Sequence, residues 1–308
     1  MSDIVNFACD VSIIVPTIGK SELLEGMIEC LSRSENVTIQ IIVSQSGSQR
    51  IYSLPQDVFY LRTRKRLMAS VSRNLASQYA IGEYLFFLDD DNVIDENLVF
   101  SLMKVLQQHR SVVLVGPIMY YKNYPNQVHC SGVDHRKVFG LTRCYTDNSF
   151  GQRTMRVCDA VPNAFMVRRR EFETINGFDS KTFPMDFEES DLAFRLRRSF
   201  NGSVVITSTA SVWHDARPPS AQALVPKSID RAYTMGRNRS LFYVRHYSSL
   251  SWLSWIICGM PVMWLVYIIA IAKAKDNSVR NRLSLTLSLS RGYYDGIVES
   301  VKWKWYSR

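Results

Sequence analysis

The stretch from Glu83 to Asn92 restricts the possible folds of this chain more than any other segment. Its apolar part, Tyr84–Leu88, follows Gly82 and is too short for a helix, so it predicts a buried strand. Three consecutive carboxylates, Asp89–Asp91, come directly after it. Because like charges repel and burial disfavours each of them, a divalent cation that also holds phosphate oxygens would stabilise this strand end. The alternative is an acidic turn followed by a helix that Asn92 or Asp95 would cap.

Strand and helix patterns alternate ahead of this stretch. Residues 11–17 and 37–43 are β-branched, apolar runs that predict buried strands, and a helical pattern capped by Ser21 separates them. Such a unit makes a right-handed crossover and predicts a doubly wound, Rossmann-like α/β domain. Ligands of this fold class bind beyond the carboxyl ends of the strands. We therefore expect a ligand site at three such ends: Pro16–Thr17, Gln45–Ser46 and Asp89–Asp91.

The net charge of +9 predicts an anionic partner. Basic residues gather at 62–66, and Arg73 follows, just ahead of the acidic strand. The run is either a solvated loop or, through Arg66 and Arg73, a contact to a pyrophosphate. Nucleic acid is disfavoured as the partner, because the sequence shows no helix-turn-helix, RNA-recognition or zinc signature beside this charge.

The composition, 46% hydrophobic and 21% charged, provides for a sizeable globular core. Six cysteines without paired spacing predict neither a zinc site nor a disulfide framework, and they favour a reducing compartment. The first residues carry Asp3 and no basic flank, so a secretory signal is not expected.

A second acidic cluster, Glu188–Glu189, begins a predicted helix in which Leu192 and Leu196 lie four residues apart. The helix macrodipole alone favours acids in a first turn. The apolar approach over 185–187 favours a second interpretation, in which burial raises a carboxyl pKa and creates a general base. Farther along, His214 follows an apolar strand and is either structural or a ligand. Residues 119–156 predict loops and short strands that face a substrate.

In their order and spacing, these segments resemble the inverting, nucleotide-sugar-dependent glycosyltransferases of family 2. The resemblance runs from Val11 to about His246 and implies the GT-A fold, with a mixed sheet. Its motifs are Val11–Thr17, Ser72–Asn74, Gly82–Asp91, Gly177–Asp179, Glu188–Arg195 and Val212–His214.

The resemblance assigns roles to the acidic residues. Asp89–Asp91 matches the DXD element of the family, in which Asp89 and Asp90 would contact the ribose or sugar. Asp91 would bind Mg²⁺ or Mn²⁺ at the diphosphate, with His214 completing the metal site and Asp89 beside it. Glu188–Glu189 takes the place of the family's Glu-Asp pair, so Glu189 would be the base.

Two departures from the family pattern matter. Glu189 is one methylene longer than the usual aspartate, which leaves Glu188 as the other candidate base. Gln45 stands where the family has an aspartate that reads the nucleobase, so the nucleobase stays open. We also expect Asp159, Asn163 and Asp191 to contact the sugar or the acceptor.

The implied chemistry is one displacement at the anomeric carbon of a nucleotide-sugar. The metal would neutralise the leaving diphosphate, and a carboxylate on the opposite face would deprotonate the acceptor hydroxyl, which inverts the centre. The acceptor would be a lipid-linked or growing glycan. Two alternatives are a catalytically inactive relative that binds nucleotide-sugar or acts as a scaffold, and a basic nucleic-acid-binding protein.

The C-terminal part differs in composition. Residues 252–272 are uncharged and long enough to span a bilayer, but Gly259 and Pro261 are expected to break the segment into two short halves. Basic residues flank both sides, which favours a broken helix in one leaflet of the cytoplasmic face. A buried helical hairpin is the alternative. We expect a glycosyltransferase domain over 1–226 and a membrane-associated helical region over 227–308.

Overall fold

The structure is a computed structural model that describes residues 9–48, 50–150, 153–216, 224–274 and 278–306. The expectation based on Asp3 lies outside these residues. The chain forms two compact units. The sheet unit comprises Met1–Val133, Cys144–Ser180 and Leu192–Ala216, and the helical unit comprises Asp134–Arg143, Lys181–Asp191 and Arg217–Arg308. The domain boundary expected between residues 226 and 227 stays a prediction.

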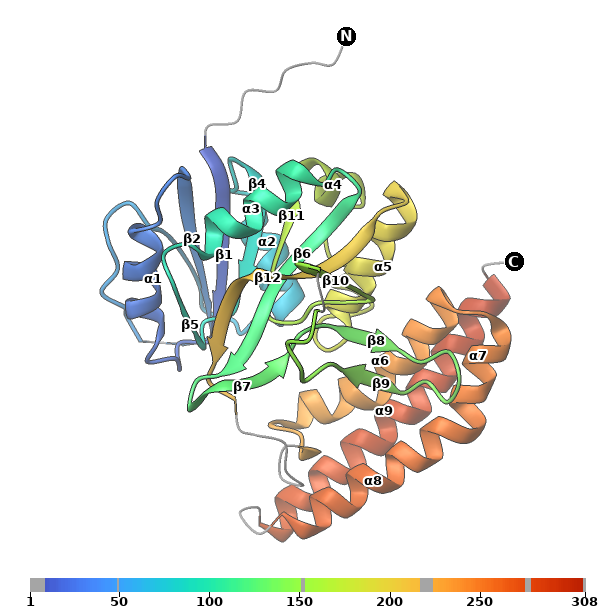
Figure 1. Cartoon of the computed structure of the whole chain (residues 1–308). Helices are drawn as coiled ribbons and strands as arrows, with labels where there is room; N and C mark the ends of the chain where they lie inside the picture. Colours follow the sequence, from blue (N-terminus) through green and yellow to red (C-terminus); the bar gives the residue numbers. More distant parts are fainter. Residues whose placement is uncertain (1–8, 49, 151–152, 217–223, 275–277, 307–308) are drawn as a thin grey trace. The chain divides into compact units, whose positions relative to one another are not determined.

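The first half of the sheet unit alternates strands and helices, as the sequence predicts. Its elements are β1 (Cys9–Thr17), α1 (Leu24–Ser32), β2 (Ile39–Ser46), β3 (Phe59–Thr63), α2 (Ala69–Ser77) and β4 (Gly82–Leu88). Strands β4, β1, β2 and β3 are parallel neighbours in this order (Figure 1). The carboxyl ends of β1, β2 and β4 therefore lie at the same end of the sheet.

The second half makes the sheet mixed. Its elements are β5 (Asn92–Ile94), α3 (Leu98–Gln108), β6 (Val112–Tyr121), β7 (Tyr124–Cys130), β10 (Met155–Cys158), β11 (Ala164–Arg168), α4 (Arg169–Thr174) and β12 (Ser203–His214). From β4 the sheet continues through β11, β6 and β12 to β10. Strand β11 runs antiparallel to β4 and β6, whereas β6 and β12 are parallel. The mixed α/β sheet expected from the sequence is confirmed.

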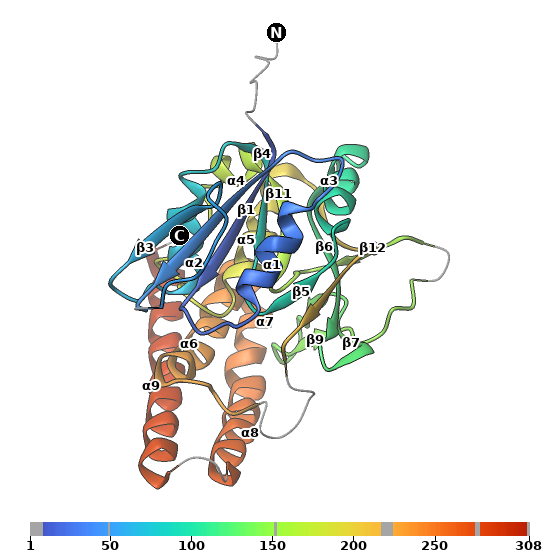
Figure 2. The ribbon, with the colours of Figure 1, turned by 90° about the vertical axis from the view of Figure 1, so that its left-hand side faces the viewer.

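Helices cover both faces of this sheet (Figure 2). The apolar side chains of α1 and α3, such as Ile28 and Leu102, share one core with β1 and β4. The opposite core contains residues of α2, α4 and α5 (Glu188–Phe200), among them Phe172 and Leu192. Burial on both faces is what the continuous apolar runs of the parallel strands require.

Two local expectations are wrong. Helix α1 begins at Leu24 without a side-chain cap, and the Ser21 hydroxyl instead donates to the carbonyl oxygen of Asp90. Asn92, one of the two candidate starts of the helix after the acidic turn, belongs to strand β5. At the other candidate, the Asp95 Oδ1 accepts from the Asn97 N–H over 2.9 Å, just ahead of α3.

The helical unit contains Asp134–Arg143, which is most of the hairpin of β8 (Val133–His135) and β9 (Thr142–Cys144), and a series of helices. These helices are α6 (Ile229–His246), α7 (Ser249–Ser254), a π-helical turn (Trp255–Gly259), α8 (Met260–Lys273) and α9 (Val279–Tyr306). The long helices α6 and α9 approach closely at glycines. A Cβ atom on Gly292 would lie 2.2 Å from the Tyr233 carbonyl oxygen, and one on Gly236 would lie 2.5 Å from the Leu289 carbonyl oxygen.

The expected break of the C-terminal apolar segment is wrong. Ser249–Lys273 is one helix of 25 residues, long and apolar enough to cross a membrane by length and composition. The π turn over Trp255–Gly259 directly precedes Pro261. Because a π turn shifts the hydrogen-bond pattern to i→i+5, it accommodates the missing N–H of the proline without ending the helix.

Candidate active site

The three aspartates follow β4, and each carboxylate has a different environment. Asp89 Oδ1 lies 2.7 Å from Arg73 Nη2, and Arg73 is only 1% exposed. The Arg73 guanidinium also lies 5.6 Å from the ring centroid of Phe178. Arg73 thus supplies one of the cations that an acidic strand end requires. The expected contact between Arg73 and a phosphate stays a prediction.

Asp90 is held by the end of the neighbouring strand. Strands β1 and β4 are parallel and in register from Cys9–Gly82 to Ile14–Phe87, so Thr17 lies beside the acidic turn. Burial raises the pKa of Asp90 to about 7; repulsion from Asp91 and Asp89 adds to this shift, and a hydrogen bond with Thr17 opposes it. Burial therefore favours the protonated form of the Asp90 carboxyl group.

Asp91 meets His214 because of strand pairing. Strand β12 runs antiparallel to β5, with His214 opposite Asn92, so the end of β12 returns to the acidic turn. The Asp215 N–H donates to the Asp91 carbonyl oxygen over 2.9 Å. As a result, His214 Nε2 lies 3.1 Å from Asp91 Oδ2. The structure thus brings together two of the predicted metal ligands.

His129 lies behind His214 and was not singled out from the sequence. Its Nδ1 is 3.3 Å from His214 Nδ1 and 3.0 Å from Met119 Sδ. Burial and, to a smaller extent, His214 lower the pKa of His129 to about 4 against the opposing effect of Asp91, so the ring is neutral at pH 7. When His214 Nε2 serves as a ligand, His214 Nδ1 carries the proton, and His129 Nδ1 can accept it in a hydrogen bond.

The donor set at Asp91 and His214 fits a divalent metal. A carboxylate oxygen and an imidazole nitrogen suit Mn²⁺, and diphosphate oxygens and water would supply the remaining ligands. Among the residues that the structure describes, no cluster of three or more His, Cys, Asp or Glu side chains has metal-site geometry. Asp89, the third expected ligand, is bonded by Arg73. Asp91 and His214 are thus a partial site that a substrate would have to complete.

Asn163 and Asn92 shape the acidic turn from within the core. Asn163 is 6% exposed and has a left-handed backbone (φ 70°), and its carbonyl oxygen accepts from the Asp89 N–H over 3.2 Å. The Asn92 amide donates to the Asn163 Oδ1 over 2.7 Å and to the Asp89 carbonyl oxygen over 2.9 Å. Asn92 was missed because its neighbours in space come from β11 and β12. The sugar contact expected of Asn163 stays a prediction.

The other expected nucleotide contacts lie on β1, β2 and the basic loop. Gln45 is 1% exposed. Its Oε1 accepts a hydrogen bond from the Tyr60 hydroxyl, and its Nε2 donates to the Arg50 carbonyl oxygen over 2.7 Å. Pro16 pairs with Ser44 across β1 and β2, and Arg66 is exposed next to Gly47. Gln45 therefore fixes the loop after β2, and the three nucleotide contacts stay predictions.

Asp159, an expected sugar contact, is part of an ion pair in the sheet unit. Its Oδ1 lies 2.7 Å from Arg197 Nη1 on helix α5. The charge of Asp159 therefore stabilises the docking of α5 on the sheet, and the sugar contact stays a prediction.

The second acidic cluster lies in the helical unit, where α5 begins with Glu188. Glu188 is 7% exposed and Glu189 is half-buried. The two residues before them, Asp186 and Phe187, have left-handed backbones with φ of 60° and 72°. For a bulky residue such as Phe187, this conformation is strained and persists only where the surroundings enforce it.

Helix α6 enforces this turn. The Thr234 hydroxyl donates to Asp186 Oδ2 over 2.6 Å, and the Asn238 amide donates to the Asp186 carbonyl oxygen over 2.9 Å. The Phe187 ring packs on the ring of Phe242, with centroids 5.1 Å apart. The first turn of α5, with both glutamates, is thereby held in one conformation within the helical unit.

Asp191, an expected acceptor contact, is 0% exposed. Its Oδ1 lies 2.8 Å from His246 Nε2 and 3.4 Å from Arg245 Nη1, at the end of α6. These contacts join α6 to the first turn of α5. Direct contact of Asp191 with an acceptor stays a prediction.

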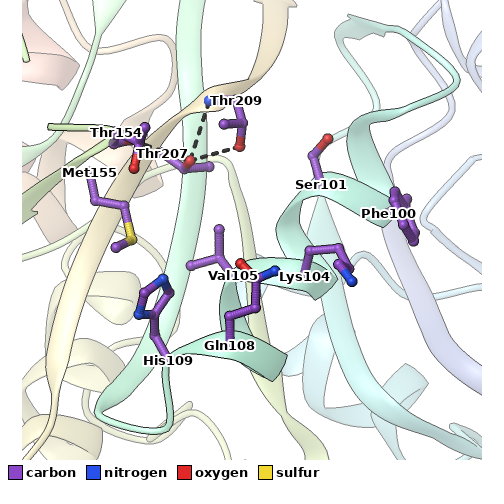
Figure 3. A pocket seen from close by; sticks show the side chains of 10 residues that line it. All are labelled: Phe100, Ser101, Lys104, Val105, Gln108, His109, Thr154, Met155, Thr207 and Thr209. Atoms are coloured by element: carbon purple, nitrogen blue, oxygen red, sulfur yellow. Dashed lines mark hydrogen bonds between the residues drawn. The ribbon is translucent and has the colours of Figure 1, made fainter. Parts of the chain in front are cut away.

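A pocket of about 220 Å³ lies on the sheet unit, where side chains of α3, β10 and β12 line it (Figure 3). Lys104 and Gln108 of α3 point toward it, as do Thr207 and Thr209 of β12. The ten residues that line it are all different from the predicted site residues. The pocket therefore gives no support to the predicted site.

Comparison with curated proteins places the chain among glycosyltransferases. It is 27% identical over 125 residues to the chondroitin synthase of Pasteurella multocida (strain Pm70), covering 38% of this chain and 13% of that protein. It is 25% identical over 142 residues to the glycosyltransferase GlyG of Streptococcus pneumoniae serotype 4 (strain ATCC BAA-334 / TIGR4), covering 44% of this chain and 45% of that protein. The matches thus span less than half the length of either relative.

Solved structures share the fold at low sequence identity. GalNAc-T7 with UDP, GalNAc and Mn²⁺ has a TM-score of 0.56 at 13% identity, covering 78% of this chain and 50% of that one. The mannosyltransferase PcManGT from Pyrobaculum calidifontis, in complex with GDP-Man and Mn²⁺, has a TM-score of 0.55 at 12% identity, covering 95% and 87%. The GT-A fold expected from the sequence is confirmed.

The sequence profile of glycosyl transferase family 2 matches residues 12–175, which is more than half of the 308 residues. The matched part contains most of strand β1, the acidic turn and Asn163. The chain therefore belongs to glycosyl transferase family 2.

Proposed function

We propose that the protein transfers a sugar from a nucleotide-sugar to a hydroxyl acceptor, with inversion and with a divalent metal. The observation that carries the proposal is the Asp91–His214 pair, 3.1 Å apart, at the carboxyl end of β4. Strand ends of this kind bind ligands in doubly wound sheets, and the two donor atoms suit Mn²⁺. Two solved proteins of the same fold contain UDP or GDP-Man together with Mn²⁺.

In this proposal the acidic turn holds the donor. Asp91 and His214 would hold the metal, which when bound offsets the charge of the leaving diphosphate. Asp89 is paired with and oriented by Arg73, so its second oxygen can accept a hydrogen bond from a ribose or sugar hydroxyl. Asp90, hydrogen-bonded with Thr17, can also donate when it is protonated.

The second half of the reaction needs a base. Glu189 would accept the proton of the acceptor hydroxyl as the new bond forms on the face opposite the leaving diphosphate. Its helical turn is fixed by Thr234 and Asn238 through Asp186, which limits the positions the carboxylate can take. Asp191 would support the same turn through His246.

We also propose that the helical unit lies on an anionic membrane surface. Helix α8 exposes a stripe of large apolar side chains, including Val262, Leu265 and Ile269 at 59%, 53% and 44% exposure. Helix α9 exposes a second stripe: Val279, Leu283, Leu287, Tyr294, Trp305 and Tyr306. Aromatic and basic residues near the α9 end are typical of an interfacial segment.

The pairing of α9 with the apolar helix supports a position on the membrane surface over a membrane crossing. Hydrogen bonds join Trp252 to Ser300 (3.1 Å), Trp264 to Ser290 (2.9 Å) and the Ala272 carbonyl oxygen to Arg282 (2.8 Å), so the helices run antiparallel. A crossing Ser249–Lys273 helix would therefore carry the charged Arg291, Asp295 and Glu299 of α9 into the hydrocarbon. Such charges are costly there, so an interfacial position is favoured. A lipid-linked acceptor would then reach the enzyme from the cytoplasmic leaflet.

A panel of nucleotide-sugars, each tested with and without Mn²⁺, checks the donor site by thermal stabilisation. We expect one nucleotide series to raise the melting temperature in the presence of Mn²⁺ only. Stabilisation without product would favour a nucleotide-sugar-binding subunit over an enzyme. No stabilisation by any donor would contradict the proposal.

Flotation with vesicles tests the membrane surface. The full-length protein should float with vesicles that contain anionic lipid and lose most binding when Val262, Leu265 and Ile269 are changed together to Ser. The exposed Ile51, at 73%, provides the control Ile51→Ser, which should float like the wild type. Equal flotation of the triple variant, or none by the wild type, would contradict the interfacial position.

A further inference from the structure

The sequence spacing of the six cysteines predicts no disulfide, but the fold brings two of them together. Cys130 ends β7 and Cys144 ends β9, and both belong to the sheet unit. The segments that follow them are joined by backbone hydrogen bonds, from the Ser131 N–H to the Tyr145 carbonyl oxygen (2.8 Å) and from the Tyr145 N–H to the Gly132 carbonyl oxygen (2.9 Å). This pairing fixes the two cysteines as close neighbours.

The two cysteines are neighbours in unequal environments. Cys144 Sγ lies 3.6 Å from the carbonyl oxygen of His129, the residue that precedes Cys130. Cys130 is 3% exposed, whereas Cys144 is exposed to solvent. The neighbouring Cys130 thiol lowers the pKa of Cys144, and Cys144 together with burial raises the pKa of Cys130. One thiol is therefore reachable and the more easily ionised, and the other is sheltered beside it.

None of the other cysteines is described as an exposed thiol with a lowered pKa beside a second, buried thiol. Burial raises the pKa of the half-buried Cys9 and Cys30, which disfavours their reactive thiolate. Cys258 is exposed, on the π turn of the helical unit. Cys158 is buried, and its Sγ lies 3.4 Å from the Ala160 carbonyl oxygen.

We propose that Cys130 and Cys144 form a reversible disulfide, with Cys144 as the attacking and Cys130 as the resolving thiol. With glutathione disulfide as oxidant, the Cys144 thiolate bonds to one glutathione sulfur and displaces the other as a thiolate. Cys130 then loses its proton to solvent, attacks Cys144 Sγ and releases the second glutathione. In balance, two protein thiols give up two electrons and two protons, and glutathione disulfide becomes two glutathione molecules.

The proposed disulfide lies next to the histidine pair His129–His214 of the proposed donor site. Cys130 follows His129, whose ring contacts His214, with ring centroids 5.1 Å apart. Reversible intracellular disulfides are typically redox-sensing or catalytic. The bond itself does not depend on the proposed glycosyl transfer, so the two proposals can fail separately.

Peptide mapping tests the proposal on the full-length protein. The native protein is treated with glutathione disulfide, and the remaining thiols are then alkylated in denaturant and located by mass spectrometry. We expect a linked Cys130–Cys144 peptide pair, equal loss of both free thiols, and full recovery of both with dithiothreitol. In Cys130→Ser, Cys144 should retain glutathione, because the resolving thiol is gone. Cys258→Ser is the matched control and should form the same link.

Three results would overturn the proposal. The first is a wild-type protein in which Cys144 carries glutathione while Cys130 is fully alkylated. The second is a link between Cys130 and Cys158 in place of Cys144. The third is a link that persists in Cys144→Ser, which would assign the chemistry to other thiols.

Discussion

Asp91 Oδ2 and His214 Nε2 lie 3.1 Å apart although 123 residues separate them in the sequence. The contact follows from the antiparallel pairing of β5 with β12, which returns the end of β12 to the acidic turn. A carboxylate and an imidazole in this position form half of a metal site, and a bound diphosphate can supply further oxygen ligands.

Nucleoside-diphosphate binding should depend on this pair. In Asp91→Asn, the metal loses an anionic ligand, so the affinity should fall at least tenfold, or about 1.4 kcal/mol, as it should for the wild type in EDTA. Calorimetry with UDP and GDP in Mn²⁺ measures this. Asp215→Asn is the control, since Asp215 is adjacent to His214 but pairs with Lys122 over 2.9 Å. Equal affinities for the nucleoside diphosphate with and without metal would contradict a metal site at the Asp91–His214 pair.

Turnover should depend on Glu189. Glu189→Gln keeps the size and polarity of the side chain but cannot accept a proton, so kcat should fall by ~10²-fold or more while donor binding persists. Steady-state kinetics and calorimetry separate the two effects. Glu173→Gln, at an exposed position of α4, is the control. If Glu188→Gln loses activity and Glu189→Gln does not, the base is Glu188; if both remain active, the mechanism is wrong.

His135 should make the protein less stable in acid. Burial lowers its pKa from 6.5 to about 3, helped by Arg239 and His246. Because the unfolded chain binds this proton first as the pH falls, the histidine reduces the free energy of unfolding progressively from pH 6.5 toward pH 3. Each pH unit contributes about 1.4 kcal/mol, or roughly 2 kcal/mol by pH 5.

Urea unfolding between pH 7 and pH 5 measures this effect. His135→Gln can keep a hydrogen bond to Ser190, which now lies 2.9 Å from His135 Nε2, and should lose that part of the pH dependence. The exposed His109→Gln is the matched control. Identical slopes for the wild type and His135→Gln would show that His135 is not buried in its neutral form.

Gly292 should be essential to the packing of α9 on α6. An added Cβ would lie 2.2 Å from the Tyr233 carbonyl oxygen, so Gly292→Ala should destabilise the protein by about 1–3 kcal/mol. Gly26 of α1 has no such neighbour within 4 Å, so Gly26→Ala should instead stabilise by up to about 1 kcal/mol. Thermal denaturation of both variants compares them. A stable Gly292→Ala would mean that the helices lie farther apart.

Strands β1, β2 and β4 could be predicted because each one is a short apolar run ending in a turn signal. The acidic strand end was identifiable for the same reason, since three carboxylates after Leu88 have few structural explanations. The meeting of Thr17 with Asp90 also follows from the parallel strand order. Periodicity and strand order were sufficient for these features.

Other features depend on contacts that no local pattern encodes. Pairing of Arg73 with Asp89 requires the position of α2 over β4, and His129 becomes visible only once β7 pairs with β6. The continuity of the helix through Pro261 depends on a π turn, which single-residue helix propensities do not predict. The Cys130–Cys144 contact likewise arises from strand pairing, not from cysteine spacing.

Release of nucleoside diphosphate from a nucleotide-sugar panel, measured with Mn²⁺ and a hydroxyl acceptor, tests the central proposal most directly. The wild type should release the diphosphate from one donor series and form a glycosylated product, and Asp91→Asn should lose at least nine-tenths of that rate, which corresponds to about 1.4 kcal/mol in the barrier. Asp215→Asn should retain it. No release from any donor, or equal release by Asp91→Asn, would contradict metal-assisted glycosyl transfer at the Asp91–His214 pair.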